Sequence, residues 1–240
     1  MMIQGILKNI IFRIDPDTGK IDEYPIPFTT PLSPTPIQLP GVAKSVTDRT
    51  ALSCAIRKGR DGNLYAANGV RNQLVRINPY TKKIDIFQDP NSNVAGNLQP
   101  FNDLSSADDG MYVTATTGNT FSLFSSATEE FTTYTVPTPA SLPLGLIVAS
   151  DGRVYLAEFG SNKILVFDPK TKRIDEYPLP EPALFPTVVR AERNGYVYFA
   201  LFVGNGIGRI NMKTYKIDIY HTDQPLLVGA ENTIDSKGGV

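Results

Sequence analysis

The sequence predicts an all-β fold, and three observations support this prediction. A unit of about 43 residues recurs along the chain, each unit carries the signatures of two β-hairpins, and no stretch shows a convincing helical period. Two hairpins per unit give four antiparallel strands, which is the composition of one propeller blade. The predicted architecture is therefore a β-propeller of four-stranded antiparallel blades.

The second hairpin of each unit is the most regular part of the repeat. Its first half ends a strand, its middle reads DPxTG, NPxTK or a variant of these, and its second half alternates apolar and polar residues as a half-exposed strand does. Proline presets φ in the middle, and Asp or Asn caps the turn with its side chain. Successive copies begin 63, 47, 43 and 43 residues apart. The copies are residues 13–27, 76–90, 123–137, 166–180 and 209–223.

The first hairpin of each unit is marked by Asp-Gly or Asn-Gly at its centre, the strongest short hairpin signature. Because this chemistry belongs to turns, we interpret these aspartates, and those of DPxTG, as turn formers rather than ligands. The pairs are Asp61 with Gly62, Asp109 with Gly110, Asp151 with Gly152, and Asn194 with Gly195.

The repeats account for about five blades' worth of sequence in one predicted propeller domain, residues 1–240. Four blades are complete and two are partial, because the chain begins early in the second strand of a blade and ends in the same register. The last strand could close a five-bladed ring with the first three. The favoured alternative is a piece of a six- or seven-bladed ring. The first interval contains an inserted loop, residues 28–48, rich in Pro, Thr and Ser, which is either an irregular surface loop or a lid over a central pocket.

Composition excludes several classes of protein. With 23 basic and 24 acidic side chains, the formal net charge is −1 and no basic block stands out, so we expect no nucleic-acid partner. No apolar run reaches the roughly 18 residues of a membrane helix, so we expect a soluble protein. No signal peptide is visible, and the sequence does not indicate the compartment. We also expect a monomer. Cys54 is the only cysteine, which rules out an intramolecular disulfide.

The repeat resembles the blade of the virginiamycin B lyase family, which reads roughly DGxxWFTE followed by NKIGRIDPxTGxxxEYPLP. The match is best at residues 151–180, where DGRVYLAE precedes NKILVFDPKTKRIDEYPLP, and it is also good at 13–27 and 204–218. The resemblance implies a magnesium-assisted lyase that opens a cyclic depsipeptide at its ester by elimination. A histidine acts as base in that family, and glutamates hold the metal at the centre of one face.

The histidine of this sequence departs from the family pattern. His221 is the only histidine, and it matches Pro178 of the best repeat, at the end of an outer strand. A central base is expected at the top of an inner strand instead. His221 is therefore a weak catalytic candidate beside the alternative of an exposed crossover residue, and the catalytic residue remains unknown.

A shorter stretch, residues 99–114 (QPFNDLSSADDGMYVT), is similar to the gluconolactonase and regucalcin family. That resemblance implies a metal-dependent lactone hydrolase in which Asn102 matches a metal ligand. The equivalent position of the next repeat is Leu144, which cannot serve as one.

Candidate site residues come from the ends of the second strands and the starts of the first strands, which face the channel rim of a propeller. The two resemblances imply Mg²⁺ or Ca²⁺ as the cofactor, and such hard cations require several converging oxygen ligands. No phosphate loop or dinucleotide fingerprint is present, so we expect no organic cofactor. The candidate metal ligands are Glu158, Asn102, Asp103 and Glu231, and the candidate substrate-binding residues are Asn68 and Thr116.

Two functions follow from these observations. The first is a metal-dependent lyase or lactone hydrolase that acts on a small cyclic ester in the central pocket. The alternative is a non-catalytic propeller that binds a protein, peptide or carbohydrate on its loop face. The resemblance favours the first, and the position of His221 favours the second.

Overall fold

The computed structural model describes residues 2–5, 10–27, 55–68, 73–90 and 101–223, together with 233, 235 and 237. These residues form antiparallel sheets, and no helix occurs among them. Accordingly, nothing in the described part of the chain is a helix long and apolar enough to cross a membrane. The chain divides into two compact units, Met1–Tyr134 and Thr135–Val240, each of which is described by itself.

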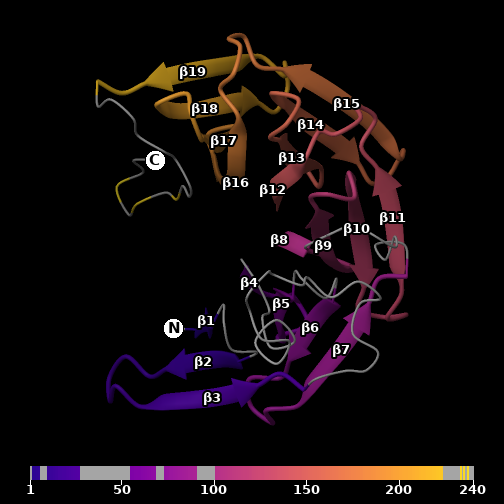
Figure 1. Cartoon of the computed structure of the whole chain (residues 1–240), viewed down its shortest axis with the longest axis vertical. Helices are drawn as coiled ribbons and strands as arrows, with labels where there is room; N and C mark the ends of the chain where they lie inside the picture. The colour runs from indigo at the N-terminus through magenta and orange to yellow at the C-terminus, as the bar shows by residue number, and fades with distance from the viewer. Residues whose placement is uncertain are drawn as a thin grey trace, which may run out of the picture. The chain divides into compact units, whose positions relative to one another are not determined.

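The first unit contains one three-stranded sheet and two four-stranded sheets (Figure 1), and within each sheet the hydrogen-bonded order follows the chain order. The three-stranded sheet is the partial blade predicted at the start of the chain. The strands are β1 (Met2–Gly5), β2 (Ile10–Ile14) and β3 (Ile21–Pro25); β4 (Ile56–Lys58), β5 (Leu64–Asn68), β6 (Gln73–Ile77) and β7 (Ile84–Gln88); β8 (Phe101–Ala107), β9 (Gly110–Ala115), β10 (Thr120–Ser125) and β11 (Phe131–Thr135).

The second unit contains two four-stranded sheets, again antiparallel and in chain order. The predicted four-stranded blade is thus confirmed in both units. The inserted loop 28–48, Cys54 and the last predicted strand lie outside the described residues. The strands are β12 (Pro143–Val148), β13 (Val154–Glu158), β14 (Lys163–Asp168) and β15 (Arg173–Pro178); β16 (Pro186–Arg193), β17 (Tyr196–Leu201), β18 (Gly206–Asn211) and β19 (Ile217–His221).

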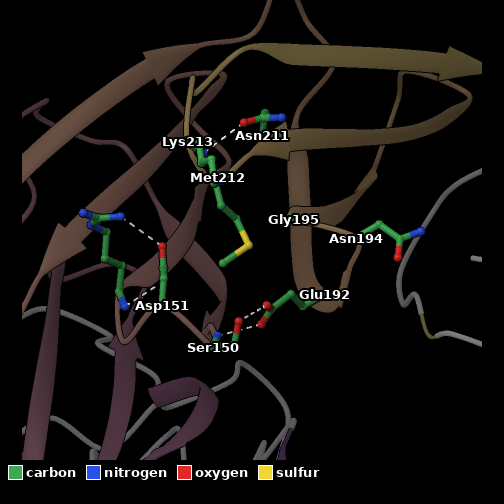
Figure 2. Close-up of a pocket in the computed structure, with 9 residues that line it drawn as sticks. Ser150, Asp151, Glu192, Asn194, Gly195, Asn211, Met212 and Lys213 are labelled. Carbon is green, nitrogen blue, oxygen red and sulfur yellow. Dashed lines mark hydrogen bonds and ion pairs between the residues drawn. The ribbon is translucent and has the colours of Figure 1, made fainter.

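The hairpin turns form as the sequence predicts. Gly152 has φ of +79°, and the Asp151 carboxylate accepts a hydrogen bond from the backbone N–H of Arg153 at 3.0 Å (Figure 2). In the second type of turn, Asp168 accepts from the backbone N–H groups of Lys170 and Thr171 at 2.9 and 3.3 Å. These backbone donors hold the pKa of Asp168 below its usual value. The turn aspartates are therefore engaged in local structure.

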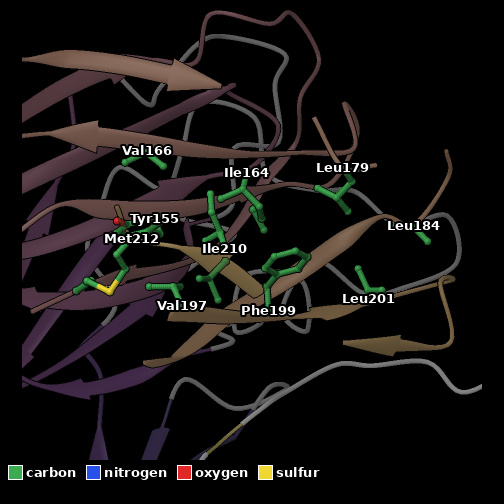
Figure 3. Close-up of a cluster of buried hydrophobic side chains, with 13 residues drawn as sticks. Tyr155, Ile164, Val166, Leu179, Leu184, Val197, Phe199, Leu201, Ile210 and Met212 are labelled. Atoms are coloured by element: carbon green, nitrogen blue, oxygen red, sulfur yellow. The ribbon is translucent and has the colours of Figure 1, made fainter. Parts of the chain in front are cut away.

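The core of the second unit is the apolar layer between its two sheets (Figure 3). Tyr155 and Ala157 of β13 alternate toward this layer, and Val197, Phe199 and Leu201 of β17 meet them there. Phe199 is fully buried and lies directly opposite Gly208 of β18. A Cβ atom at Gly208 would be 2.1 Å from Cζ of Phe199, so this ring occupies the space that a side chain would need.

Gly208→Ala should destabilise the protein by about 1–3 kcal/mol, because the added methyl group collides with the Phe199 ring. Phe199→Leu should relieve the collision, so the double variant should lose less stability than the two single losses combined. Urea unfolding of all four proteins measures this coupling. A Gly208→Ala variant as stable as the parent, or strictly additive losses, would contradict the packing described.

Candidate functional site

Glu158 is the last residue of β13 and is fully buried. All five residues of this strand are buried, because its two faces are both covered within the protein. The backbone of Glu158 pairs with Pro143 of β12 and with Lys163 of β14, so its position is fixed from both sides. The strand therefore places a carboxylate where it is shielded from bulk solvent.

The two carboxylate oxygens of Glu158 have different surroundings. Ser161, in the turn after β13, donates its hydroxyl to Oε2 at 2.5 Å. Oε1 is buried and accepts no hydrogen bond from the described residues. A buried polar atom without a partner costs about 1–3 kcal/mol, so Oε1 is a strained feature of this site.

The carboxylate of Glu176, in contrast, has both a cation and hydrogen-bond donors beside it. The Lys163 ammonium lies 3.0 Å from Oε2 of Glu176 and donates to the Thr138 hydroxyl at 2.6 Å. Thr138 in turn donates its backbone N–H and its hydroxyl to Glu176 at 2.9 and 2.8 Å. The Ser141 hydroxyl donates to the carbonyl of Thr138. The nearest cation and several donors are thus committed to Glu176 rather than to Glu158.

These surroundings move the two carboxyl groups in opposite directions. Burial raises the pKa of Glu158 from its ordinary 4.5 to about 7. The hydrogen bond from Ser161 is the largest opposing effect, the charge of Glu176 adds to the rise, and Ser141 and Lys163 oppose it more weakly. Burial also opposes ionisation of Glu176, but the hydrogen bonds from Thr138 and the Lys163 ammonium hold its pKa below the usual value. Two neighbouring carboxyl groups with separated pKa values are typical of acid–base sites.

Three other predicted residues lie in the first unit. Asn68 ends β5 and is fully buried, with its amide nitrogen 3.5 Å from the Gln73 side-chain oxygen. Thr116 follows β9 and is half-buried. Asp103 is buried in β8, where Oδ1 lies 3.2 Å from the Arg57 guanidinium.

The predicted metal ligands do not form a described cation site. Oδ1 of Asp103 accepts the Leu104 N–H at 2.8 Å and also pairs with Arg57. Asn102 lies in β8, but its side chain is outside the described part of the structure, as is all of Glu231. Within the described residues, no three His, Cys, Asp or Glu side chains are arranged to hold a metal ion. The metal prediction for Glu158, Asn102, Asp103 and Glu231 therefore stays a prediction.

His221 lies at the end of β19, the last strand of its sheet, and is exposed. Its Nδ1 is 2.8 Å from the carbonyl of Gly204, and its Nε2 is 3.0 Å from the Glu181 carboxylate. These acceptors raise the pKa of His221, with Glu181 as the larger cause. The imidazole thus joins a strand end to the chain segment that precedes β16.

A cluster of aromatic residues lies near the ends of β13 and β17, and it is not among the candidate site residues predicted from the sequence. The ring centroid of Phe159 lies 5.2 Å from that of Phe185 and 5.6 Å from that of Phe202. Phe202 is 41% exposed and the neighbouring Val203 is 60% exposed. Phe159 directly follows β13 and Phe202 directly follows β17. This recurrence of Phe after the second strand of two successive units could have identified the cluster from the sequence.

Phe185 holds an unusual backbone conformation, with φ of +52° directly before a proline. Bulky residues rarely adopt this left-handed region, but Leu142 holds it as well, with φ of +49° before Pro143, so the conformation belongs to the repeat. The Asn162 side-chain oxygen stabilises the segment by accepting the N–H groups of Leu184 and Phe185 at 2.9 and 3.0 Å.

Glu158→Gln should change how stability depends on pH. Because the folded state holds the Glu158 proton more tightly than the unfolded state, the parent should lose stability as pH rises from about 4.5 to 7, by about 3 kcal/mol. The variant keeps the side-chain shape and lacks this loss. Urea unfolding from pH 4 to 8 measures the difference, with exposed Glu130→Gln as control. Parallel pH profiles for the parent and Glu158→Gln would contradict the raised pKa.

Since His221 is the only histidine, its imidazole signals can be assigned directly in an NMR pH titration. We expect a pKa above 6.5 that falls in Glu181→Gln, because that variant removes the carboxylate at Nε2. Exposed Glu130→Gln should leave the titration unchanged. A His221 titration insensitive to Glu181→Gln would show that the ion pair does not form in solution.

The fold matches solved β-propellers. A catalytically inactive variant of virginiamycin B lyase from Staphylococcus aureus with quinupristin superposes with a TM-score of 0.75 at 21% identity, over 94% of this chain and 67% of that one. A streptogramin B lyase gives 0.76 at 22% identity, over 96% and 67%. The WD40 repeats of RRP9 give 0.62 at 10% identity, over 88% and 56%. The chain thus spans about two thirds of the length of each lyase.

The sequence comparisons are more specific than the structural ones. No curated protein matches the sequence significantly. The family model for the virginiamycin B lyase family matches residues 42–227, which include the described sheets from β4 to β19. This chain belongs to the virginiamycin B lyase family.

Proposed function

We propose that this chain is a lyase-like enzyme that opens a small cyclic ester, with Glu158 as its proton-transfer group. The observation that carries the proposal is the buried Glu158 carboxyl group, with one oxygen bound by Ser161 and the other lacking a described partner. A carboxyl group with a pKa of about 7 is suited to accept and return protons near neutral pH. Quinupristin, present in the matched lyase structure, supplies the substrate class.

The proposed step is an elimination. Oε1 of Glu158 takes the proton from the carbon next to a carbonyl group, the C–H electron pair becomes a C=C bond, and the neighbouring C–O bond breaks to release a carboxylate. Ser161 keeps Oε2 in place, which leaves Oε1 to receive the proton. A lactone hydrolase would use the same oxygen to deprotonate water.

Magnesium or calcium remains part of the hypothesis, but no step is assigned to a metal. A hard cation takes six or more oxygen ligands, and the described candidates contribute only Glu158, since Asp103 is paired with Arg57. The described donor set therefore does not fit such an ion by itself.

A second candidate function is binding without catalysis. The exposed Phe202 and Val203, supported by Phe159 and Phe185, form an apolar surface at the strand ends of the second unit. Apolar patches with aromatic residues are typical of protein and peptide contacts. The position of His221 on an outer strand favours this alternative as well.

The assay uses quinupristin and a panel of simple lactones, with ring opening followed by mass spectrometry. Loss of an acid–base group should lower the rate 10²- to 10⁴-fold in Glu158→Gln, because the amide cannot accept the proton. The exposed Glu181→Gln should retain the parent rate. Each protein is assayed with added Mg²⁺, with added Ca²⁺ and with a chelator.

The outcomes separate the two functions. Turnover by the parent that survives Glu158→Gln would exclude Glu158 as the proton-transfer group. Saturable binding of quinupristin without turnover, lost in Phe202→Ser, would support the binding alternative. A rate independent of Mg²⁺, Ca²⁺ and chelator would remove the metal from the hypothesis.

A further inference from the structure

A cavity of about 530 Å³ opens at the hairpin turns of the second unit (Figure 2). It is lined by the β12–β13 turn, the β16–β17 turn and the turn after β18. These turns lie at the other end of β13 from Glu158, about 16 Å away along the strand. The volume is within the range of small-molecule sites, and the location is independent of the proposed catalytic group.

The acceptors around the cavity are already engaged. Asp151 accepts hydrogen bonds from the Arg153 backbone N–H, the Arg153 guanidinium and the Tyr155 hydroxyl, at 3.0, 3.1 and 3.0 Å. Glu192 accepts the N–H of Ser150 at 2.7 Å and also the Ser150 hydroxyl. Each carboxylate is therefore compensated by fixed local donors.

Several donors around the same cavity remain open. The Lys213 ammonium and the Asn194 side-chain amide have no hydrogen bond or ion pair with any described residue. The Arg153 guanidinium pairs with Asp151 through Nη1 at 3.1 Å, and its Nε lies 3.9 Å from the Asp168 carboxylate, whereas neither contact uses Nη2. Arg153 comes from the first sheet of the unit and Lys213 from the second, so two cations flank the cavity from different sheets.

An apolar surface completes the cavity. The Met212 side chain reaches into the space between Asp151 and Glu192 (Figure 2), and this residue is only 8% exposed. A thioether is polarisable and adapts to irregular apolar groups. The cavity thus offers cationic donors beside a small apolar surface.

We propose that this cavity binds a small organic monocarboxylate, with its carboxylate between Lys213 and Arg153 and its short carbon chain against Met212. The open cationic donors favour an anionic group, and the Met212 surface favours an apolar chain next to it. The negative charges of Asp151 and Glu192 disfavour a second charge on the ligand, so a monoanion should bind better than phosphate.

The test is an NMR titration of the whole chain with acetate, propionate, butyrate and pentanoate at constant ionic strength. Affinity should rise about fourfold with each added methylene group, because each one buries against Met212. Backbone signals of residues 150–153, 192–195 and 211–213 should shift. Lys213→Gln should weaken pentanoate binding about tenfold, since it removes a charged hydrogen bond.

Lys170→Gln is the matched control, because Lys170 occupies the same repeat position in the preceding sheet and does not line the cavity. It should leave the affinity unchanged, as should Glu158→Gln, so failure here is distinguishable from failure of the proposed enzyme function. Pentanol binding as tightly as pentanoate, phosphate binding more tightly than pentanoate, or full affinity in Lys213→Gln would each overturn the proposal. The absence of shifts at the three turns would overturn it as well.

Discussion

Burial of apolar sheet faces against one another is the interaction on which the rest of this structure depends. Within the first unit, Tyr65 and Ala67 of β5 face the sheet that follows, whereas Ala66 faces the sheet that precedes. A strand covered on both faces is largely apolar, and every residue of β9 and β13 is buried, as are four of the five residues of β5. Apolar residues therefore fill the strand interiors, and polar side chains gather at the strand ends and turns.

Glu158 shows what this constraint does to a polar group at the end of such a strand. The layer that buries β13 also removes water from the carboxylate, and the available cation, Lys163, is held by Glu176 and Thr138. The fold thus keeps one carboxyl group ionised and makes its neighbour easy to protonate. The difference between the pKa values of these two glutamates arises from packing and from which of them pairs with Lys163.

The two ends of the strands in the second unit carry different chemistry, because sheet packing governs one end and turn geometry governs the other. At one end, β13 and β17 present Glu158 and the aromatic cluster of Phe159, Phe185 and Phe202. At the other end, tight turns use their Asp and Asn side chains to satisfy backbone donors, and the charged groups left over surround the cavity. Turn geometry decides which donors remain available there, and packing decides which carboxyl group is easy to protonate at the opposite end.

The sequence by itself determined the repeat, the four-stranded unit, the hairpin turns and the strand-end position of Glu158, because turn chemistry and alternation are local properties. It also placed His221 correctly on an outer strand. Only the tertiary structure decided that Asp103 is paired with Arg57, that Lys163 neutralises Glu176, and that Phe159 meets Phe185 and Phe202. These are contacts between residues up to 46 positions apart, and burial, charge pairing and cavity shape exist only once the sheets pack.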